Sequence, residues 1–451
     1  MDSGHTLTPR ERMLCGALSL VVAASRFFAI AKSLWDWDEA LFALALRDYD
    51  VAMYHPHPPG FPLFVGVAKL LTLCGIDSFH ALQAIVVIAS LFVFPAMFFL
   101  ARELGASFFV ACASALTLAF LPNVWFFGGT AFSDVPSMVL ALAACALLLR
   151  GRTSPRALLL GGLVAGIAVG VRPQNLLFVA VPFVLAFLRR RGATMLAAAI
   201  ATIIIALSYG GAIIATGGWQ PYSEALAHHS DYIRAVDSFL SPIRPPLWKV
   251  FDDFFFWPFR APVINVALLA LALIGLARIN RIALAIFVPF AIFAWLSLDF
   301  HSSSRFSIAY MPLYALLAAH GAELFRRARH AIAAALLALM IVWTWPALRV
   351  VHTSDAPPVA ACTWIRTHVP RGTTIFVGES LGAHAALLLP DYDVQSVRES
   401  DRPRANSWLL TEEGSGFTRP RARLARAITR PRYFEVSVRP APRPPLHPPG
   451  S

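Results

Sequence analysis

Residues 13–40 have the sequence MLCGALSLVVAASRFFAIAKSLWDWDEA. The first part, 13–31, is apolar apart from Arg26. A run of about 20 apolar residues is long enough to cross the hydrocarbon core of a bilayer as an α-helix. The acids Asp36, Asp38 and Glu39 follow soon after this run. The stretch therefore predicts a membrane-spanning helix that leads into a charged loop.

The whole chain has the composition of a membrane protein. Of its 451 residues, 57% are hydrophobic and 14% are charged, against about 25% charged residues in soluble domains. The mean hydropathy is +0.63. This composition excludes an ordinary soluble enzyme. The predicted spans are 13–31, 80–101, 107–126, 133–150, 157–171, 173–188, 193–215, 262–278, 282–297, 306–324 and 330–346.

The net charge of +12 comes from arginines in short clusters between the apolar runs. No basic face or groove emerges, so we do not expect nucleic acid as a partner. Every second connection carries a cluster, which places all of them on the cytoplasmic side if the N-terminus is cytoplasmic. The clusters are Arg10/Arg12, Arg102, Arg150/Arg152/Arg156, Arg189/Arg190/Arg191, Arg278/Arg281 and Arg326/Arg327/Arg329.

This alternation holds only if residues 61–75 do not cross the membrane. That apolar stretch is shorter than a full span, has prolines near its start and contains Lys69. It is therefore expected to lie in the outer interface or to re-enter from outside. The predicted fold class is an all-α polytopic membrane protein with about 11 transmembrane helices and interfacial helices in the first external loop. The C-terminus is then extracytoplasmic.

Three regions are predicted along the chain. Residues 1–350 form the transmembrane domain, 351–400 a small extracytoplasmic α/β segment, and 401–451 a tail rich in Arg and Pro. The tail has little apolar periodicity and is expected to be largely disordered. The predicted elements after residue 350 are a helix at Ala360–His368, a strand at Thr373–Val377, a helix at Leu381–Leu389 and a strand at Tyr433–Val438.

The first external loop carries the strongest functional signal. Asp36, Asp38 and Glu39 precede an amphipathic stretch at 40–47 and then the turn His55-Pro-His-Pro-Pro-Gly60. One interpretation is an acidic cap that only marks the non-cytoplasmic side, with prolines that turn the chain. Ionisable groups near a membrane are costly to hold and usually functional, which favours a site.

Several short motifs, taken together in this order, resemble the GT-C glycosyltransferases, in particular the protein O-mannosyltransferases and the lipid A aminoarabinose transferase. The turn at 57–63 also resembles an HPPG-x-PL motif of a related bacterial and animal branch. The resemblance covers about residues 13–350. The motifs are DEALFA at 38–43, HPPGFPL at 57–63, SDVP at 133–136, GVRPQ at 170–174, and RFS at 305–307 followed by YMP at 310–312.

The resemblance implies an enzyme that moves a sugar from a polyprenyl-phosphate carrier to a lipid, glycan or protein acceptor outside a bacterial inner membrane. A carboxylate can take the proton of the acceptor hydroxyl as it attacks. We expect Asp38 to be this base and Glu39 to orient it or the acceptor. Asp134 is then the second acid, related to Asp38 through a divalent metal or through direct contact, and the cofactor stays undetermined.

The leaving group of such a reaction is a lipid phosphate, which requires fixed positive charge. Arg172 and Arg305 lie at predicted external junctions, and His55 or His57 could also donate a hydrogen bond. The alternatives are plain interfacial anchors for the arginines and a turn residue for His57. The aminoarabinose branch has a Lys where this chain has His57. Arg26 is expected to pair with an acid of the same region.

Other readings compete with this one. The pattern Gly378-Glu-Ser380-Leu-Gly382 is that of a nucleophile elbow, but the segment is too short for an α/β-hydrolase sheet. His228 and His229 point apart on a helix, which favours a solvated face over a metal site. A transporter or flippase of lipid-linked or small polar substrates is the main alternative, although we find no inverted repeat. A non-catalytic membrane scaffold is the third reading.

Overall fold

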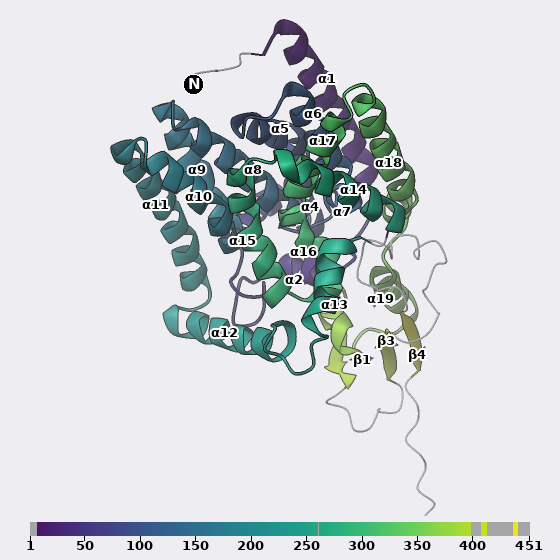
Figure 1. Cartoon of the computed structure of the whole chain (residues 1–451). Helices are drawn as coiled ribbons and strands as arrows, with labels where there is room; N and C mark the ends of the chain where they lie inside the picture. The colour runs from purple at the N-terminus through teal and green to yellow at the C-terminus, as the bar shows by residue number, and fades with distance from the viewer. Residues whose placement is uncertain (1–6, 260, 398–406, 413–435, 441–451) are drawn as a thin grey trace, which may run out of the picture.

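The computed structural model describes residues 7–259, 261–397, 407–412 and 436–440. Helices packed side by side form most of it, and a small sheet lies at one end (Figure 1). The helices of the first half are α1 (Pro9–Arg26), η1 (Phe27–Ala29), α2 (Trp37–Ala45), α3 (Pro62–Leu73), α4 (Ser78–Leu91), α5 (Val93–Glu103), α6 (Phe108–Phe120), α7 (Pro122–Phe127), α8 (Asp134–Arg150), α9 (Pro155–Val171), α10 (Leu176–Phe187) and α11 (Arg191–Ala215).

The second half adds further helices and the strands. They are α12 (Trp219–Tyr232), α13 (Leu247–Phe251), α14 (Pro262–Gly275), α15 (Arg281–Ser297), α16 (Ser303–Phe306), α17 (Met311–Leu324), α18 (Arg329–Thr353), α19 (Pro357–His368), β1 (Thr374–Val377), α20 (Gly382–Leu388), β2 (Asp393–Ser396), β3 (Trp408–Thr411) and β4 (Ser437–Pro440).

Three helical segments of the described residues are long and apolar enough to cross a bilayer. They are Pro9–Ala29, Arg191–Ala215 and Arg329–His368, and the bent pair α3–α4 would make a fourth if counted as one span. Other predicted spans coincide with shorter or broken helices. The predicted span 107–126, for example, is divided at Leu121, because Pro122 has no N–H with which to continue helix α6. The count of 11 therefore stays a prediction.

Residues 61–75 form a helix of their own. Helix α3 is bent by 120° from α4, and Asp77 caps the new helix by accepting hydrogen bonds from the N–H groups of Phe79 and His80. The turn between them passes through Gly75, whose φ of +85° is a conformation that glycine adopts at little cost. The separate helix agrees with the predicted change of direction, and its place in the outer interface stays a prediction.

The connections that carry arginine clusters gather at one end of the bundle, where α1 begins (Figure 1). Arg150 Nη1 lies 3.3 Å from Glu103 Oε1, and Arg190 Nε donates to the carbonyl of Arg152 at 3.2 Å. Asn280 Nδ2 donates to the carbonyl of Leu104 at 2.8 Å. These contacts join the α5–α6, α8–α9, α10–α11 and α14–α15 connections, as the predicted alternation requires.

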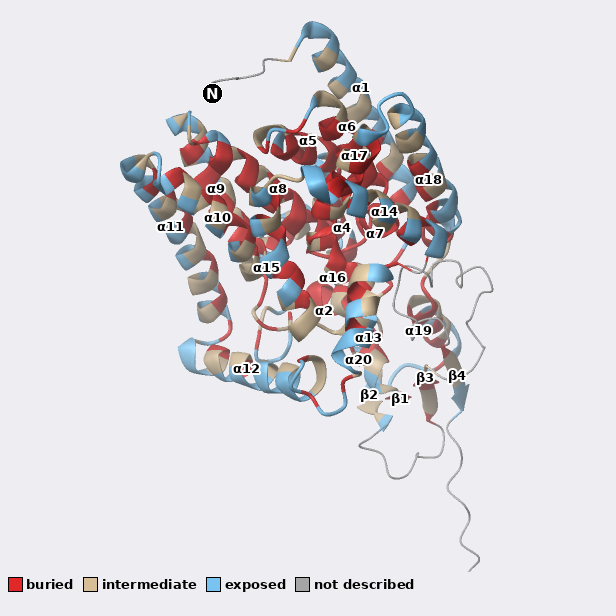
Figure 2. Ribbon diagram, in the orientation of Figure 1, coloured by how far each residue is buried: buried red, intermediate tan, exposed pale blue. Residues whose placement is uncertain are grey.

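The outer helices carry many exposed residues (Figure 2), and a number of these are large and apolar. Leu207 and Ile214 on α11 and Val342 on α18 are each more than 70% exposed. Buried residues concentrate in the helices between them, such as α6, α8 and α17. Apolar exposure of this extent is typical of a surface that faces lipid, which supports a membrane protein.

The C-terminal part forms a four-stranded sheet with the order β2-β1-β3-β4. Strand β1 is parallel to β2 and β3, and β3 is antiparallel to β4. The predicted helix, strand and helix between 360 and 389 are confirmed as α19, β1 and α20. Strand β3 was not predicted, and β4 overlaps the predicted strand at 433–438. The remaining residues of the predicted disordered tail lie outside the described part of the chain.

Helix α20 of this C-terminal part packs against α2 of the first loop. Arg47 Nη1 donates to the carbonyl of Leu387 at 3.0 Å, and Lys32 Nζ lies 3.0 Å from Asp355 Oδ2. A Cβ atom at Gly382 would lie 3.5 Å from the Trp37 ring. The first loop is therefore held between the helical bundle and the C-terminal sheet.

Candidate active site

The start of helix α2 is built around Glu39. Its Oε2 accepts hydrogen bonds from the N–H groups of Trp35 at 2.5 Å and Asp36 at 3.0 Å, and its Oε1 accepts one from Ala131 at 2.7 Å. Asp36 caps the same helix. Burial raises the pKa of Glu39 to about 7, although the backbone N–H groups act in the opposite direction. Glu39 therefore fastens the first loop to the segment before α8, which favours a positioning role.

Asp38 faces Arg305, which enters from helix α16. Arg305 Nη1 lies 2.6 Å from Asp38 Oδ2 and 4.0 Å from Asp36 Oδ1. The guanidinium carbon of Arg305 lies 4.6 Å from the centre of the Phe132 ring, and only 10% of the side chain is exposed. A buried guanidinium in contact with carboxylates and an aromatic ring is held in a defined position.

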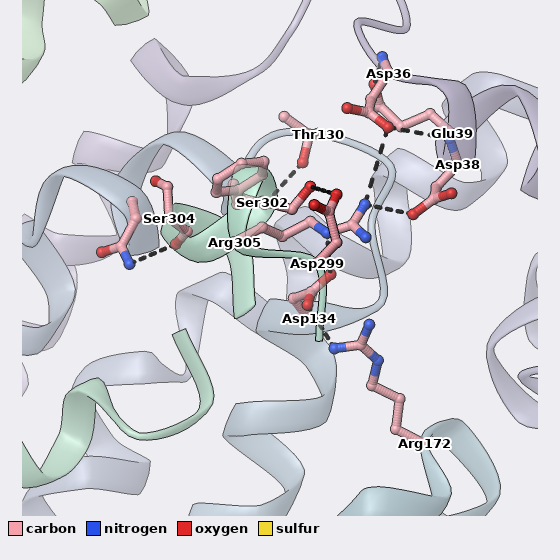
Figure 3. A network of polar contacts seen from close by, with 12 residues as sticks. Asp36, Asp38, Glu39, Thr130, Asp134, Arg172, Asp299, Ser302, Ser304 and Arg305 are labelled. Carbon is pink, nitrogen blue, oxygen red and sulfur yellow. Dashed lines mark hydrogen bonds and ion pairs between the residues drawn. The ribbon is translucent and has the colours of Figure 1, made fainter. Parts of the chain in front are cut away.

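Asp134 and Arg172 extend this arrangement to two further connections. Asp134 is the first residue of α8, and its Oδ1 lies 2.5 Å from Nη1 of Arg172, which directly follows α9. Asp134 Oδ2 lies 3.9 Å from Arg305 Nε. Figure 3 shows the resulting chain of charges. We call Asp36, Asp38, Asp134, Arg172 and Arg305 the acid–arginine cluster.

His57 borders the cluster, whereas His55 does not join it. His57 Nδ1 lies 3.9 Å from Asp38 Oδ1, and burial lowers the pKa of His57 to about 4 in spite of this acid. His57 is therefore neutral at pH 7. The backbone of His55 pairs with that of Asp50, and no ion pair connects His55 with the cluster in the residues that the structure describes.

Sequence reasoning missed His229 on α12. Its ring centre lies 6.2 Å from that of His57, and Tyr222 of the same helix donates from its hydroxyl to the carbonyl of Pro59 at 3.0 Å. His228 is exposed, as expected for a solvated face, whereas His229 is half-buried and departs from that expectation in part. Tyr222, Ala225 and His229 recur at a helical spacing, and that pattern was the available signal.

A small cavity adjoins the cluster beside Arg305 and Asp36. Its lining combines aromatic rings with side chains that carry hydroxyl groups. Asp299 holds the hydroxyl-bearing turn, because its side chain accepts hydrogen bonds from His301 N at 3.0 Å and Ser302 Oγ at 3.1 Å. The lining includes Trp35, Phe127, Phe132, Thr130, Ser302 and Ser304.

Arg26 does not pair with an acid of this region, contrary to expectation. Its Nη2 donates to the carbonyl of Ala119 at 2.7 Å, and its guanidinium lies 5.9 Å from the centre of the Phe120 ring. In the described residues, no salt bridge reaches Arg26. The last carbonyls of a helix have no donor within that helix, and α6 ends at Phe120. A backbone acceptor therefore takes the place of the expected carboxylate.

The geometry does not favour a metal between Asp38 and Asp134. Arg305 lies between these two acids, so direct charge pairing through a guanidinium replaces the metal alternative. A search of the described residues finds no group of three or more His, Cys, Asp or Glu placed to hold a metal ion.

The hydrolase reading is not supported by the C-terminal sheet. Ser380 Oγ is buried and has no hydrogen-bond partner among the described residues, so no base activates it. The sheet itself has four short strands in the part that the structure describes.

Comparisons with known proteins bear on the fold. No protein-family model matches the chain, and no curated protein matches it in sequence. Solved structures do match. The archaeal oligosaccharyltransferase AglB from Archaeoglobus fulgidus, in complex with an inhibitory peptide and a dolichol-phosphate, has a TM-score of 0.57 at 11% identity, over 90% of this chain and 70% of its own.

Two other solved structures agree with this result. ArnT from Cupriavidus metallidurans bound to undecaprenyl phosphate has a TM-score of 0.55 at 12% identity, over 94% of this chain and 97% of its own. The arabinofuranosyltransferase AftD from Mycobacteria has a TM-score of 0.51 at 15% identity, over 94% of this chain and 37% of its own. The expected resemblance is thus confirmed in three dimensions, and the chain has the fold of the GT-C glycosyltransferases.

Proposed function

We propose that the protein is a glycosyltransferase that moves a hexosyl or pentosyl group from a polyprenyl-phosphate carrier to an acceptor on the extracytoplasmic side. The observation that carries this proposal is the acid–arginine cluster, which lies away from the arginine-bearing connections on a GT-C fold. Structures with this fold contain dolichol-phosphate in AglB and undecaprenyl phosphate in ArnT, which supports the donor class.

Asp38 is the general base in this proposal. Its side chain is 19% exposed, against 3% for Asp134 and 14% for Asp36, so it is the acid of the cluster that an acceptor reaches most readily. Arg305 contacts Oδ2, which orients the carboxylate and leaves Oδ1 toward His57. A carboxylate in this position can take the proton of an acceptor hydroxyl during attack.

Arg305 and Arg172 stabilise the leaving phosphate. Among the described residues, no acceptor lies within hydrogen-bond distance of the Nε–H group of either guanidinium, although Asp134 Oδ2 lies 3.9 Å from Arg305 Nε. A buried N–H group without an acceptor is costly, and a phosphate oxygen would satisfy it with a charge-assisted bond. His57 is neutral and can donate one further hydrogen bond, whereas Glu39 holds the loop in place.

The test is an Asp38→Asn variant in membranes supplied with polyprenyl-phosphate sugars. Loss of the general base should lower the transfer rate by about 10²–10⁴-fold. Asp231→Asn on α12 is the matched control, because Asp231 is exposed and its one salt bridge within the described residues is with nearby Arg234 at 3.5 Å. Unchanged transfer in Asp38→Asn would contradict the mechanism, and transport without any transfer would favour the transporter alternative.

A further inference from the structure

A second binding feature lies at the end of the bundle opposite to the acid–arginine cluster. Helices α1 and α18 both pack on α6. An open groove of about 1180 Å³, counted with the space on its open side, is lined by these three helices. We call it the α1–α6–α18 groove. Its apolar walls include Leu14, Leu18, Phe109, Leu116, Ala333 and Leu337.

Contacts between α18 and the segment after α1 bound the groove at one end. Near its C-terminal end, α18 contacts the segment that follows α1, where His352 Nδ1 lies 2.8 Å from the carbonyl oxygen of Ile30. The Phe28 and Trp345 rings also meet there, with centres 4.9 Å apart. At the other end, the groove is lined by Leu14 and Leu18 of α1, by side chains of α6, and by the part of α18 between Arg329 and Leu337. A long, narrow apolar chain fits such a space.

The open end of the groove is positively charged. Arg329 lines it and lies with its guanidinium carbon 4.9 Å from the centre of the Phe109 ring, and His330 lines it beside that ring. Arg326 and Arg327 precede them in the same connection. Acidic side chains also lie near this rim: Glu323 accepts a hydrogen bond from Ser107, and Glu11 lies near Cys112. Arginine residues thus outnumber acidic residues near the mouth of an apolar groove.

From this combination we propose that the α1–α6–α18 groove is a binding site for an anionic phospholipid, with one acyl chain along α6 and the phosphate at Arg329. A basic pocket between apolar helices recognises an anionic head group through charge, whereas a zwitterionic lipid offers no net negative charge. The ring of Phe109 holds the guanidinium of Arg329 at the level where the head group would lie. The site is separate from the proposed transfer chemistry.

The test measures lipid retention by the detergent-purified protein with native mass spectrometry, using phosphatidylglycerol, phosphatidylcholine and undecaprenyl phosphate as separate probes. The wild type should retain phosphatidylglycerol in preference to phosphatidylcholine. Undecaprenyl phosphate retained at the acid–arginine cluster should not depend on Arg329. Arg329→Gln should weaken this binding about tenfold, as expected for one charge-assisted contact. Arg189→Gln, in a basic connection that does not line the groove, is the control and should keep it.

A second variant tests the chain-binding part of the groove without touching its charge. Ala333→Phe should fill the space between α6 and α18 and displace phosphatidylglycerol while Arg329 stays in place. Three results would overturn the proposal: equal retention of phosphatidylglycerol and phosphatidylcholine, the same loss in Arg189→Gln as in Arg329→Gln, or specific retention of undecaprenyl phosphate alone. Arg329→Gln keeps the test decisive if Ala333→Phe fails to fold.

Discussion

The two ends of the bundle use arginine in opposite ways. At one end, Arg305 and Arg172 are nearly buried and contact acids that come from other connections. At the other end, Arg150 is 56% exposed and pairs with Glu103, and Arg190 donates to backbone carbonyls. Buried charges are costly and are kept where they do chemistry, whereas exposed ones set the orientation in the membrane. Burial therefore distinguishes the arginines of the candidate site from the arginines that indicate membrane topology.

The largest effect is expected for Arg305→Gln. This change removes the cation that faces Asp36, Asp38 and Asp134 and leaves these acids facing one another. Loss of one partner of a buried ion pair costs about 3–5 kcal/mol of unfolding free energy. Titration of the purified protein with a denaturing detergent measures it, together with a transfer assay that should show no product. Arg305→Lys keeps the charge and should recover part of the stability. If Arg305→Gln lowers the unfolding free energy by less than about 1 kcal/mol, Arg305 contributes no more than an exposed arginine does.

The next effect concerns Glu39, because an amide cannot accept all three backbone hydrogen bonds. Glu39→Gln should cost about 1–3 kcal/mol of unfolding free energy at pH 8. Burial raises the pKa of Glu39 from 4.5 to about 7, so between these values the folded protein binds a proton that the unfolded chain has released. The contribution of Glu39 to stability therefore falls as pH rises through this window.

The pH experiment compares unfolding of the wild type and Glu39→Gln between pH 4.5 and 7. His57 and His384 have lowered pKa values of about 4 and about 3, and their contributions rise with pH in part of this window. The difference between the two proteins removes this histidine effect. Glu224→Gln on the exposed face of α12 is the control. Identical pH slopes for the wild type and Glu39→Gln would show that Glu39 keeps its ordinary pKa.

A smaller effect is expected for His229→Ala. The ring of His229 lies beside that of His57 at the edge of the cluster, so its loss should lower the transfer rate about tenfold while the protein stays folded. His228→Ala is the matched control, because the neighbouring side chain is exposed. Equal transfer rates for the two variants would show that this face of α12 is a solvated face without a role in transfer.

The smallest effect is expected at the basic end. Arg150→Gln removes an exposed pair with Glu103, and such pairs contribute about 0–1 kcal/mol. Transfer activity should not change. A loss comparable to that of Arg305→Gln, measured in the same detergent titration, would remove the distinction between the two ends.

Local sequence patterns determined most of the elements and the identity of most cluster residues. The apolar runs predicted where the helices lie, because burial and lipid contact both require continuous apolar surface. The acids of the first loop stood out because ionisable groups beside a membrane are unusual. Asp134, Arg172 and Arg305 were identified through the motifs that resemble the GT-C glycosyltransferases and through their predicted external positions. The alternation of arginine clusters also divided the connections into two sets. The structure gathers one set at one end of the bundle, and the other set contains the acid–arginine cluster.

Only the tertiary structure decided which partners these charges have. Arg26 meets the carbonyl of Ala119, Glu39 meets the N–H of Ala131, and His229 reaches His57, each across a long separation in sequence. Folding decides which backbone groups at helix ends and in loops are left without a partner. No pattern of residues in the sequence therefore predicts these groups. The sequence alone thus determined which side chains are chemically suited to a site, and packing decided which of them position it and which contact each other.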